Sequence, residues 1–252
     1  MTNQSNSPGF GGVPLPKMGP EEEFSVEAAR ARLGESFDPI PAPQLPPADP
    51  DLDRVVDELR RLREATAALA HSDVELGDIA DRLAEVADLL EPRVPSPARR
   101  LEIMWTGAGT RRSNPVGGQE NPIAPPVQFF GCDDGSVMAE VTLGPVYQGP
   151  PGCVHGGISA LIIDHMMGFA NHWGGRFGMT AHYEIDYRSP TPLLEPLTFR
   201  SWVAETEGRK TWTHATIHAG DRLCVEARGL FLEASVPVPG QPGTRSTIAD
   251  AP

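Results

Sequence analysis

The stretch GPPGCVHGGISALIIDHMMGFANHW, residues 149–173, decides the fold class of this chain of 252 residues. A loop of prolines and glycines ends at His155, and the apolar segment after it predicts a long helix over about 158–173. Runs rich in β-forming residues lie on both sides of this helix. They occupy residues 137–143, 180–187, 197–205, 210–218 and 223–234. One helix set among antiparallel strands predicts an α+β fold.

The start of the predicted helix offers backbone amides to a ligand. No conventional side-chain cap precedes it, and the first N–H groups of a helix have no partner within the helix. Gly156 and Gly157 let another molecule approach this backbone closely. Free N–H groups at the positive end of a helix dipole suit an anion or a developing oxyanion. In a second interpretation, the two glycines only allow the helix start to pack tightly against a strand.

Asp164 lies in the middle of the apolar helix, where nearly every neighbour is hydrophobic. An unpaired buried carboxylate is costly, and Asp is a poor residue for a helix interior. The position is therefore a candidate for a catalytic base or nucleophile. The alternative is an Asp on a solvated strip of the helix, with His165 and His172 nearby.

Gly156 and Asp164 cannot act on one carbonyl group from the same helix. They are eight residues apart in the sequence, which places them about 12 Å apart along a helix axis. If the two groups cooperate, the Gly156 amide of one chain must meet Asp164 of another chain. The spacing then requires at least a dimer with two equivalent sites.

Several features together resemble the hotdog thioesterase superfamily, specifically the branch that includes the phenylacetate-pathway thioesterases. They are the Pro/Gly loop, the His155-Gly156-Gly157 helix start, the Asp nine residues after His155, and the strand TAHYEIDYRSP at residues 180–190. The resemblance covers residues 124–234. It implies an antiparallel sheet wrapped around a central helix, dimers that join two sheets edge to edge, and active sites at the interface.

The resemblance also implies roles for individual residues. In such enzymes the amide matching Gly156 polarises the thioester carbonyl, and the acid matching Asp164, from the partner chain, activates water or attacks as nucleophile. The hydroxyl matching Thr180 orients the water or the acid, and the side chain matching His155 holds the loop or the thioester end. Gly149 departs from the pattern, because some relatives have Asn six residues before the His. The implied reaction is hydrolysis of acyl-CoA to a free acid and CoA, without a metal or other cofactor.

The rest of the sequence divides around this domain. Residues 1–50 are rich in proline and should form a mostly disordered tail, because they cannot bury enough apolar surface. Leucine and valine at helical spacing predict a helical hairpin over 51–92, with Ser72 or Asp73 as N-cap of its second helix and Pro92 at its end. The hairpin is either a structural appendage or a surface for another protein. The other predicted segments are a linker and loop at 93–123, the hotdog domain at 124–236 and a disordered tail at 237–252.

Substrate contacts are assigned to the helix start and to the few basic residues of the domain. Gly157 is assigned to substrate binding because, without a side chain, it leaves the backbone at the helix start accessible. Arg188, Arg209 and Lys210 are candidates for binding the CoA phosphates. Acyl-carrier protein stays open as a thioester carrier beside CoA. The rival function is a non-catalytic module that binds acyl-CoA and uses its hairpin for protein interaction. Asp164 favours the hydrolase, because a pure binder needs no carboxylate in an apolar helix.

Composition restricts the partners and the compartment. The formal net charge of −13 argues against nucleic acid as a partner. Three widely spaced cysteines fit neither a disulfide framework nor a paired zinc site, so a reducing cytoplasm is the simplest interpretation. No apolar run reaches the length that a membrane span requires. The expected partners are therefore an acyl-CoA substrate and further copies of the chain, as a homodimer or a dimer of dimers.

Overall fold

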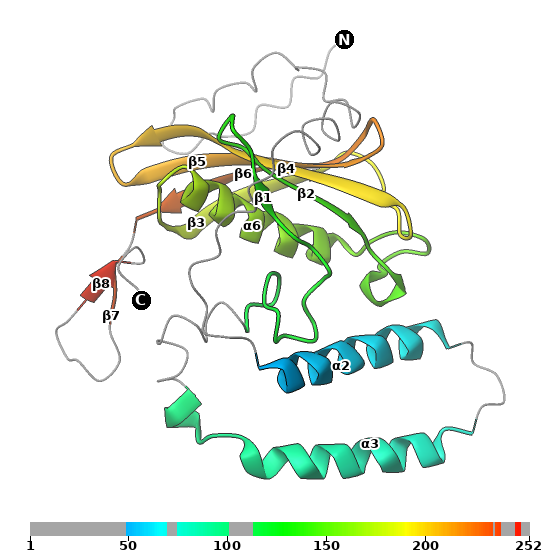
Figure 1. The fold of residues 1–252 in the computed structure, drawn as a ribbon. Helices are drawn as coiled ribbons and strands as arrows, with labels where there is room; N and C mark the ends of the chain where they lie inside the picture. The colour runs from blue at the N-terminus through cyan, green and yellow to red at the C-terminus, as the bar shows by residue number, and fades with distance from the viewer. Residues whose placement is uncertain (1–48, 70–74, 101–112, 234, 238–244, 248–252) are drawn as a thin grey trace.

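A computed structural model describes residues 49–69, 75–100, 113–233, 235–237 and 245–247. A six-stranded antiparallel sheet with the order β1-β2-β4-β5-β6-β3 curves over one long helix, α6 (Gly156–Trp173) (Figure 1). This is the expected hotdog arrangement, and the α+β assignment is confirmed. The strands are β1 (Phe130–Gly131), β2 (Val137–Thr142), β3 (Met179–Tyr187), β4 (Pro196–Glu207), β5 (Lys210–Ala219) and β6 (Arg222–Leu232).

The last three strands of the sheet form two consecutive hairpins, as the short joints between them require. β4 pairs with β5 and β5 pairs with β6, both antiparallel. Each turn contains a glycine with positive φ, Gly208 at 56° and Gly220 at 59°. Glycine adopts this conformation at little cost because it has no Cβ. β3 pairs with the far side of β6 and forms one edge of the sheet.

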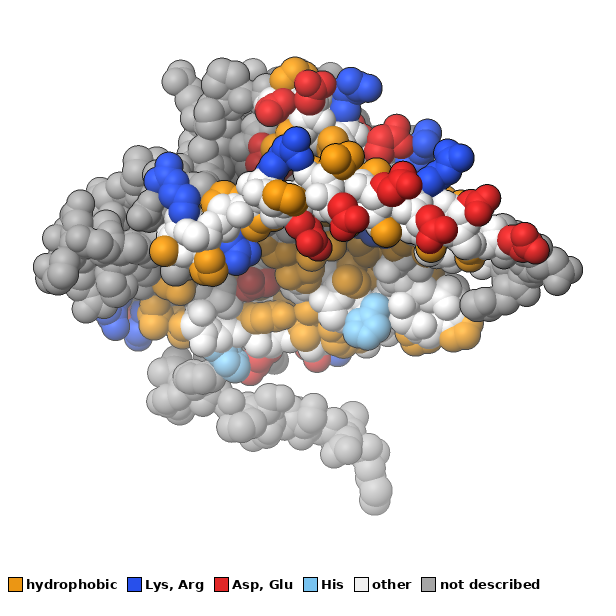
Figure 2. Space-filling model, turned by 90° about the horizontal axis from the view of Figure 1, so that it is seen from below, with side chains coloured by type: hydrophobic (Ala, Val, Ile, Leu, Met, Phe, Trp, Pro, Cys, Tyr) orange, Lys and Arg blue, Asp and Glu red, His pale blue; other side chains and the backbone are white. Residues whose placement is uncertain are grey.

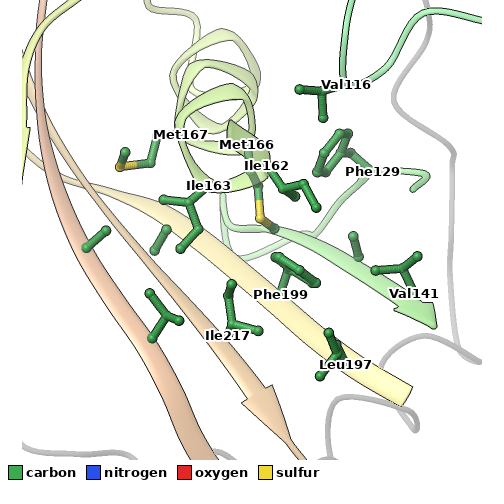
Figure 3. Packing of buried hydrophobic residues seen from close by; sticks show 14 of the residues in the cluster. Val116, Phe129, Val141, Ile162, Ile163, Met166, Met167, Leu197, Phe199 and Ile217 are labelled. Atoms are coloured by element: carbon green, nitrogen blue, oxygen red, sulfur yellow. The ribbon is translucent and has the colours of Figure 1, made fainter. Parts of the chain in front are cut away.

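The core lies between α6 and the concave face of the sheet. The helix side chains at this face are fully buried. They are Ile162, Ile163, Met166 and Met167. Figure 3 shows Ile163 and Met166 pointing toward Phe199 of β4 and Ile217 of β5. Met167 points away from these residues and lies near Gly229 of β6. Burial of each such side chain contributes roughly 1.5–3 kcal/mol, so this contact fixes the position of α6 on the sheet.

A loop covers the opposite side of α6. Val116 and Phe129 of this loop are buried against the helix (Figure 3). The rings of Phe129, His165 and Phe169 form a cluster with centroid distances of 5.4–5.5 Å. Burial in this cluster lowers the pKa of His165 to about 4, against a weaker opposite effect of Asp164. His165 is therefore a neutral core side chain at physiological pH.

The lowered pKa of His165 predicts sensitivity to mild acid. An unfolded histidine has a pKa near 6.5, so the contribution of neutral His165 to stability is complete above pH 6.5 and is lost as pH falls toward 4. We expect this group to cost up to about 2 kcal/mol of folding stability at pH 5. Thermal melting at pH 7 and pH 5 should show a smaller loss for His165→Leu than for the native chain. Parallel losses in the two proteins would contradict this assignment.

Two helices precede the hotdog domain, α2 (Pro50–Ala68) and α3 (Gly77–Leu90), and they lie on the side of α6 away from the sheet (Figure 1). The Asp49 side chain caps α2. α3 begins at Gly77, with Leu76 as the N-cap residue and no side-chain cap bond. Ser72 and Asp73, the predicted caps, lie outside the described residues. The 3-10 turn η2 (Glu91–Arg93) follows α3 and contains Pro92, as expected for a residue that ends a helix.

The two helices differ in how they pack. α2 buries Val56, which is 3% exposed, and the helix contacts the 3-10 turn η3 (Pro145–Tyr147). α3 buries none of its residues. Its apolar side chains are 44–62% exposed and share the surface with acidic and basic groups in Figure 2. They are Ile79, Leu83, Val86, Leu89 and Leu90, together with the N-cap residue Leu76.

The C-terminal segment differs from the expectation of a disordered tail over 237–252. Its described parts form two short strands, β7 (Ser235–Pro237) and β8 (Arg245–Thr247), which pair antiparallel. The expectation for residues 1–50 falls outside the described residues except at positions 49 and 50, where helix α2 begins. In the part of the chain described here, no helix is long and apolar enough to cross a membrane.

Candidate active site

The side chain of His155 caps helix α6. His155 is the N-cap residue, with φ −63° and ψ 131°, and its Nδ1 accepts a hydrogen bond of 2.9 Å from the Gly157 amide. The sequence indicated no conventional cap, and an imidazole nitrogen here takes the place of the usual Ser, Thr, Asp or Asn oxygen. The Gly157 N–H, expected to face the substrate, is occupied by this bond.

The Gly156 amide differs from its neighbours in the first turn. The His155 carbonyl accepts bonds from the amides of Ile158 at 2.9 Å and Ser159 at 3.2 Å, and Gly157 bonds to the imidazole. Within the described residues, no acceptor is found for the Gly156 amide, at position N1 of α6. A free amide at the positive end of a helix dipole can hold an anionic oxygen.

The loop before His155 explains the unusual glycine at position 149. The Gly149 amide donates to the carbonyl of Cys153 at 2.9 Å, and the Val154 amide donates to Thr191 at 2.9 Å. A Cβ atom on residue 149 would lie 2.7 Å from Cα of His155, closer than real Cβ atoms come. The Asn that the resemblance led us to expect at this position would not fit this backbone. Glycine therefore follows from the close approach of the two loop segments.

Tyr187 of β3 contacts the helix start, which the sequence reasoning missed. Its hydroxyl donates a hydrogen bond of 2.9 Å to the Gly156 carbonyl, and its side chain is 53% exposed. A Cβ on Gly156 would lie 3.2 Å from the Tyr187 ring. The one sequence feature that could have pointed to this contact is the position of Tyr187, at the end of the strand that carries the family resemblance. Its contact depends on how β3 lies beside α6, which residue spacing does not give.

Asp164 and Thr180 are brought together across α6 and β3. The Thr180 hydroxyl donates to Oδ1 of Asp164 at 2.8 Å. Asp164 is half-buried and Thr180 is exposed, so the carboxylate faces the edge of the sheet and not the core between helix and sheet. The pKa of Tyr183, on the same strand, is raised by burial first and by the charge of Asp164 second. The carboxylate therefore acts electrostatically on the β3 edge.

The two halves of the candidate site lie apart within one chain. Gly156 with Tyr187 marks one end of β3, and Asp164 with Thr180 marks the other end. Along α6 the Gly156 and Asp164 positions are about 12 Å apart. β3 is the edge strand of the sheet and is paired on one side, with β6, among the described residues.

The three basic residues considered for phosphate binding have different surroundings. Arg188, at the Gly156 end of β3, bonds to the carboxylates of Glu226 and Asp186 at 2.6 Å and 3.0 Å. The bond to Glu226 is the main cause that raises the pKa of Arg188. Lys210 lies at the Thr180 end of the sheet, 3.3 Å from Glu207. Arg209 is exposed in the adjacent β4–β5 turn.

Comparison with known proteins gives a family model and curated relatives. The model described as the thioesterase superfamily matches residues 151–226. The acyl-coenzyme A thioesterase THEM4 of Rattus norvegicus is 41% identical over 88 residues, which are 34% of this chain and 38% of that protein. THEM4 of Xenopus laevis is 38% identical over 92 residues, 36% of this chain and 41% of that protein. The chain thus matches about two fifths of the length of these relatives.

A solved structure matches over more of both molecules. A thioesterase superfamily protein of known crystal structure is 45% identical to this chain in sequence, and the two structures superpose with a TM-score of 0.66. The match covers 75% of this chain and 93% of that protein. Residues 113–252 make up less than 75% of the chain. The match must therefore also include residues before position 113.

Proposed function

The chain belongs to the thioesterase superfamily, and we propose that it hydrolyses acyl-CoA thioesters to a free acid and CoA. The observation that carries this proposal is the hydrogen bond between Thr180 and Asp164, which orients a carboxylate in an otherwise apolar part of α6. The name of the THEM4 relatives, acyl-coenzyme A thioesterase, supports the substrate class. We place the reaction in a reducing cytoplasm, which three cysteines spaced too widely for a disulfide framework favour.

We propose a homodimer in which two β3 strands pair antiparallel. Thr180 and Tyr187 lie at similar distances from the middle of β3, so a two-fold axis there places Thr180 of one chain beside Tyr187 of the other. Thr180 holds Asp164 and Tyr187 holds Gly156. The pairing therefore joins the carboxylate of one chain to the free amide of its partner. It also gives the exposed edge of β3 a partner strand.

In the proposed reaction, the thioester carbonyl oxygen accepts a hydrogen bond from the Gly156 amide. The Asp164 carboxylate of the other chain takes a proton from water while the water oxygen bonds to the carbonyl carbon. The negative charge that develops on the carbonyl oxygen is stabilised by the amide. When the C–S bond breaks, the CoA sulfur leaves with the electron pair and takes the proton from Asp164, and the carboxylic acid is released.

A second route uses the same groups with Asp164 as the nucleophile. Its carboxylate oxygen bonds to the carbonyl carbon, the CoA thiolate leaves, and water then hydrolyses the mixed anhydride. In both routes Thr180 orients Asp164, and His155 shapes the helix start by holding Gly157. For the CoA phosphates we propose Arg209 and Lys210, with Arg188 available only if phosphate displaces the carboxylates that it now binds.

The test is hydrolysis of a thioester panel by the purified full-length chain, with CoA release followed by a thiol reagent. The panel contains aliphatic acyl-CoA of several lengths, phenylacetyl-CoA for the branch that the sequence resembles, and acyl-carrier protein thioesters. We expect turnover of at least one acyl-CoA. Tight binding without turnover would support the rival, a non-catalytic acyl-CoA module. Turnover of the acyl-carrier-protein thioesters alone would show that the carrier is acyl-carrier protein and not CoA.

Removal of the Thr180 hydroxyl should lower kcat without unfolding the protein. Thr180→Val keeps the shape of the side chain and leaves Asp164 without its donor. We expect kcat to fall roughly tenfold, less than the hundredfold or more of a lost general base, because the carboxylate itself remains. Thr180→Ser keeps a hydroxyl and should stay close to the native rate. Steady-state kinetics on both variants provide the comparison. Native turnover in Thr180→Val would separate Thr180 from the mechanism.

A further inference from the structure

Helix α2 contacts the segment that supports the proposed oxyanion donor, although it lies far from the site in the sequence. Resting on the function proposed above, we propose that Arg63 of α2 is a positioning residue, which acts through Tyr147 and His155 on the Gly156 amide. The N-terminal helix is then part of the catalytic unit. This role differs from both alternatives drawn from the sequence, a structural appendage and a surface for another protein.

Arg63 binds two segments of the hotdog domain at once. Its Nη1 donates to the Pro122 carbonyl at 2.7 Å, and its Nη2 donates to the Tyr147 hydroxyl at 3.1 Å. The guanidinium also lies 5.3 Å from the centroid of the Tyr147 ring. Glu64 accepts a bond of 3.1 Å from the same Nη2 and balances its charge. Bonds from a charged donor are stronger than neutral ones, so this contact fixes the tyrosine in place.

Tyr147 carries this contact to the helix start. It is 5% exposed, in η3, and burial is the main cause that raises its pKa. Its hydroxyl donates to the Ala124 carbonyl at 3.4 Å, while its backbone carbonyl accepts the His155 amide at 2.8 Å. One buried residue thus connects Arg63, through its side chain, to the residue that caps α6, through its backbone carbonyl. The His155 backbone sets the direction of the next amide, that of Gly156.

The arrangement matters for the rate because an oxyanion donor works only when it is aimed correctly. A small misplacement of a reacting group can lower the rate up to about a hundredfold. Substrate binding depends less on this amide than the transition state does, since the negative charge appears only on the way to the intermediate. Loss of positioning should therefore lower kcat and leave KM nearly unchanged.

Arg60 offers a matched control on the same helix. Its Nη2 donates to the carbonyls of Gly118, Gln119 and Asn121 at 2.9–3.3 Å, so it also docks α2 on the loop. The bonds of its side chain involve neither Tyr147 nor the loop before His155. Arg60→Met removes the same charge as Arg63→Met and more of the bonds that dock α2 on the loop, three carbonyl bonds against one. A difference between the two variants therefore measures the route through Tyr147.

The experiment compares Arg63→Met and Arg60→Met in the full-length chain by two readouts. With an acyl-CoA that the native protein hydrolyses, we expect Arg63→Met to lower kcat about tenfold with KM within twofold, and Arg60→Met to stay within twofold for both. Hydrogen exchange by mass spectrometry should show faster exchange at residues 147–157 in Arg63→Met. In Arg60→Met the faster exchange should be confined to residues 118–122.

Arg63→Lys keeps the proposal testable if Arg63→Met does not fold. Lysine keeps the charge but cannot hold the Pro122 carbonyl and the Tyr147 hydroxyl with one fixed fork, so kcat should lie between the native and methionine values. Equal kcat and equal exchange at residues 147–157 in the Arg63 and Arg60 variants would overturn the positioning role. Exchange does not need a substrate, so it decides this point even if no thioester is hydrolysed and the proposed function fails.

Discussion

Asp164→Asn should lower kcat a hundredfold or more while the protein still folds and binds acyl-CoA. Asn has the same size as Asp, and its amide oxygen can still accept the hydrogen bond from Thr180. What it loses is the ability to take a proton from water or to attack the thioester carbon. A lost general base costs roughly a hundred- to ten-thousandfold. Steady-state kinetics and acyl-CoA titration measure the two effects separately.

The control for this variant is Asp221→Asn, at the exposed β5–β6 turn. It changes the same functional group outside the proposed site and should retain native kcat and melting temperature. Near-native turnover in Asp164→Asn would remove Asp164 from the mechanism. A loss of turnover that accompanies a large fall in melting temperature would assign the residue to folding.

Gly156→Pro should have an effect of similar size, because it removes the N–H of the proposed oxyanion donor. Proline is well tolerated at N1 of a helix, and the extended ψ of 131° at His155 suits a residue that precedes proline. Removal of one oxyanion donor costs about a hundred- to a thousandfold in kcat. Gly156→Ala adds a Cβ against Tyr187 but keeps the N–H, so we expect it to stay within a few fold of the native rate.

Mixed dimers test whether the two groups come from different chains. A dimer of one Asp164→Asn chain and one Gly156→Pro chain contains one intact site and one site with both defects. Subunit exchange between the two inactive homodimers should restore about half of the native turnover in each mixed dimer. Mass spectrometry verifies the exchange. No recovery after verified exchange would show that Gly156 and Asp164 do not share a site across an interface.

Much of the fold could be predicted because its signals are local. A long apolar run predicts α6, and two short glycine-containing joints predict the hairpins of β4, β5 and β6. β2 pairs with β4 and β3 pairs with β6, and because a helix or other strands separate these partners in the sequence, no short joint predicts the pairing. Asp164 also stood out locally, since a carboxylate among apolar residues contradicts both helix propensity and burial.

The sequence by itself determined the helix, the strands, Asp164 and the spacing that separates Asp164 from Gly156. Only the tertiary structure decided which groups meet. It shows that His155 caps α6 and that Gly149 lies too close to His155 for a side chain. It also shows that the Tyr187 hydroxyl bonds to the Gly156 carbonyl. It also brought Arg63 to Tyr147 across 84 positions of sequence. Periodicity reports which face of an element is buried, whereas contacts between distant side chains depend on how the elements pack, and no local pattern encodes that.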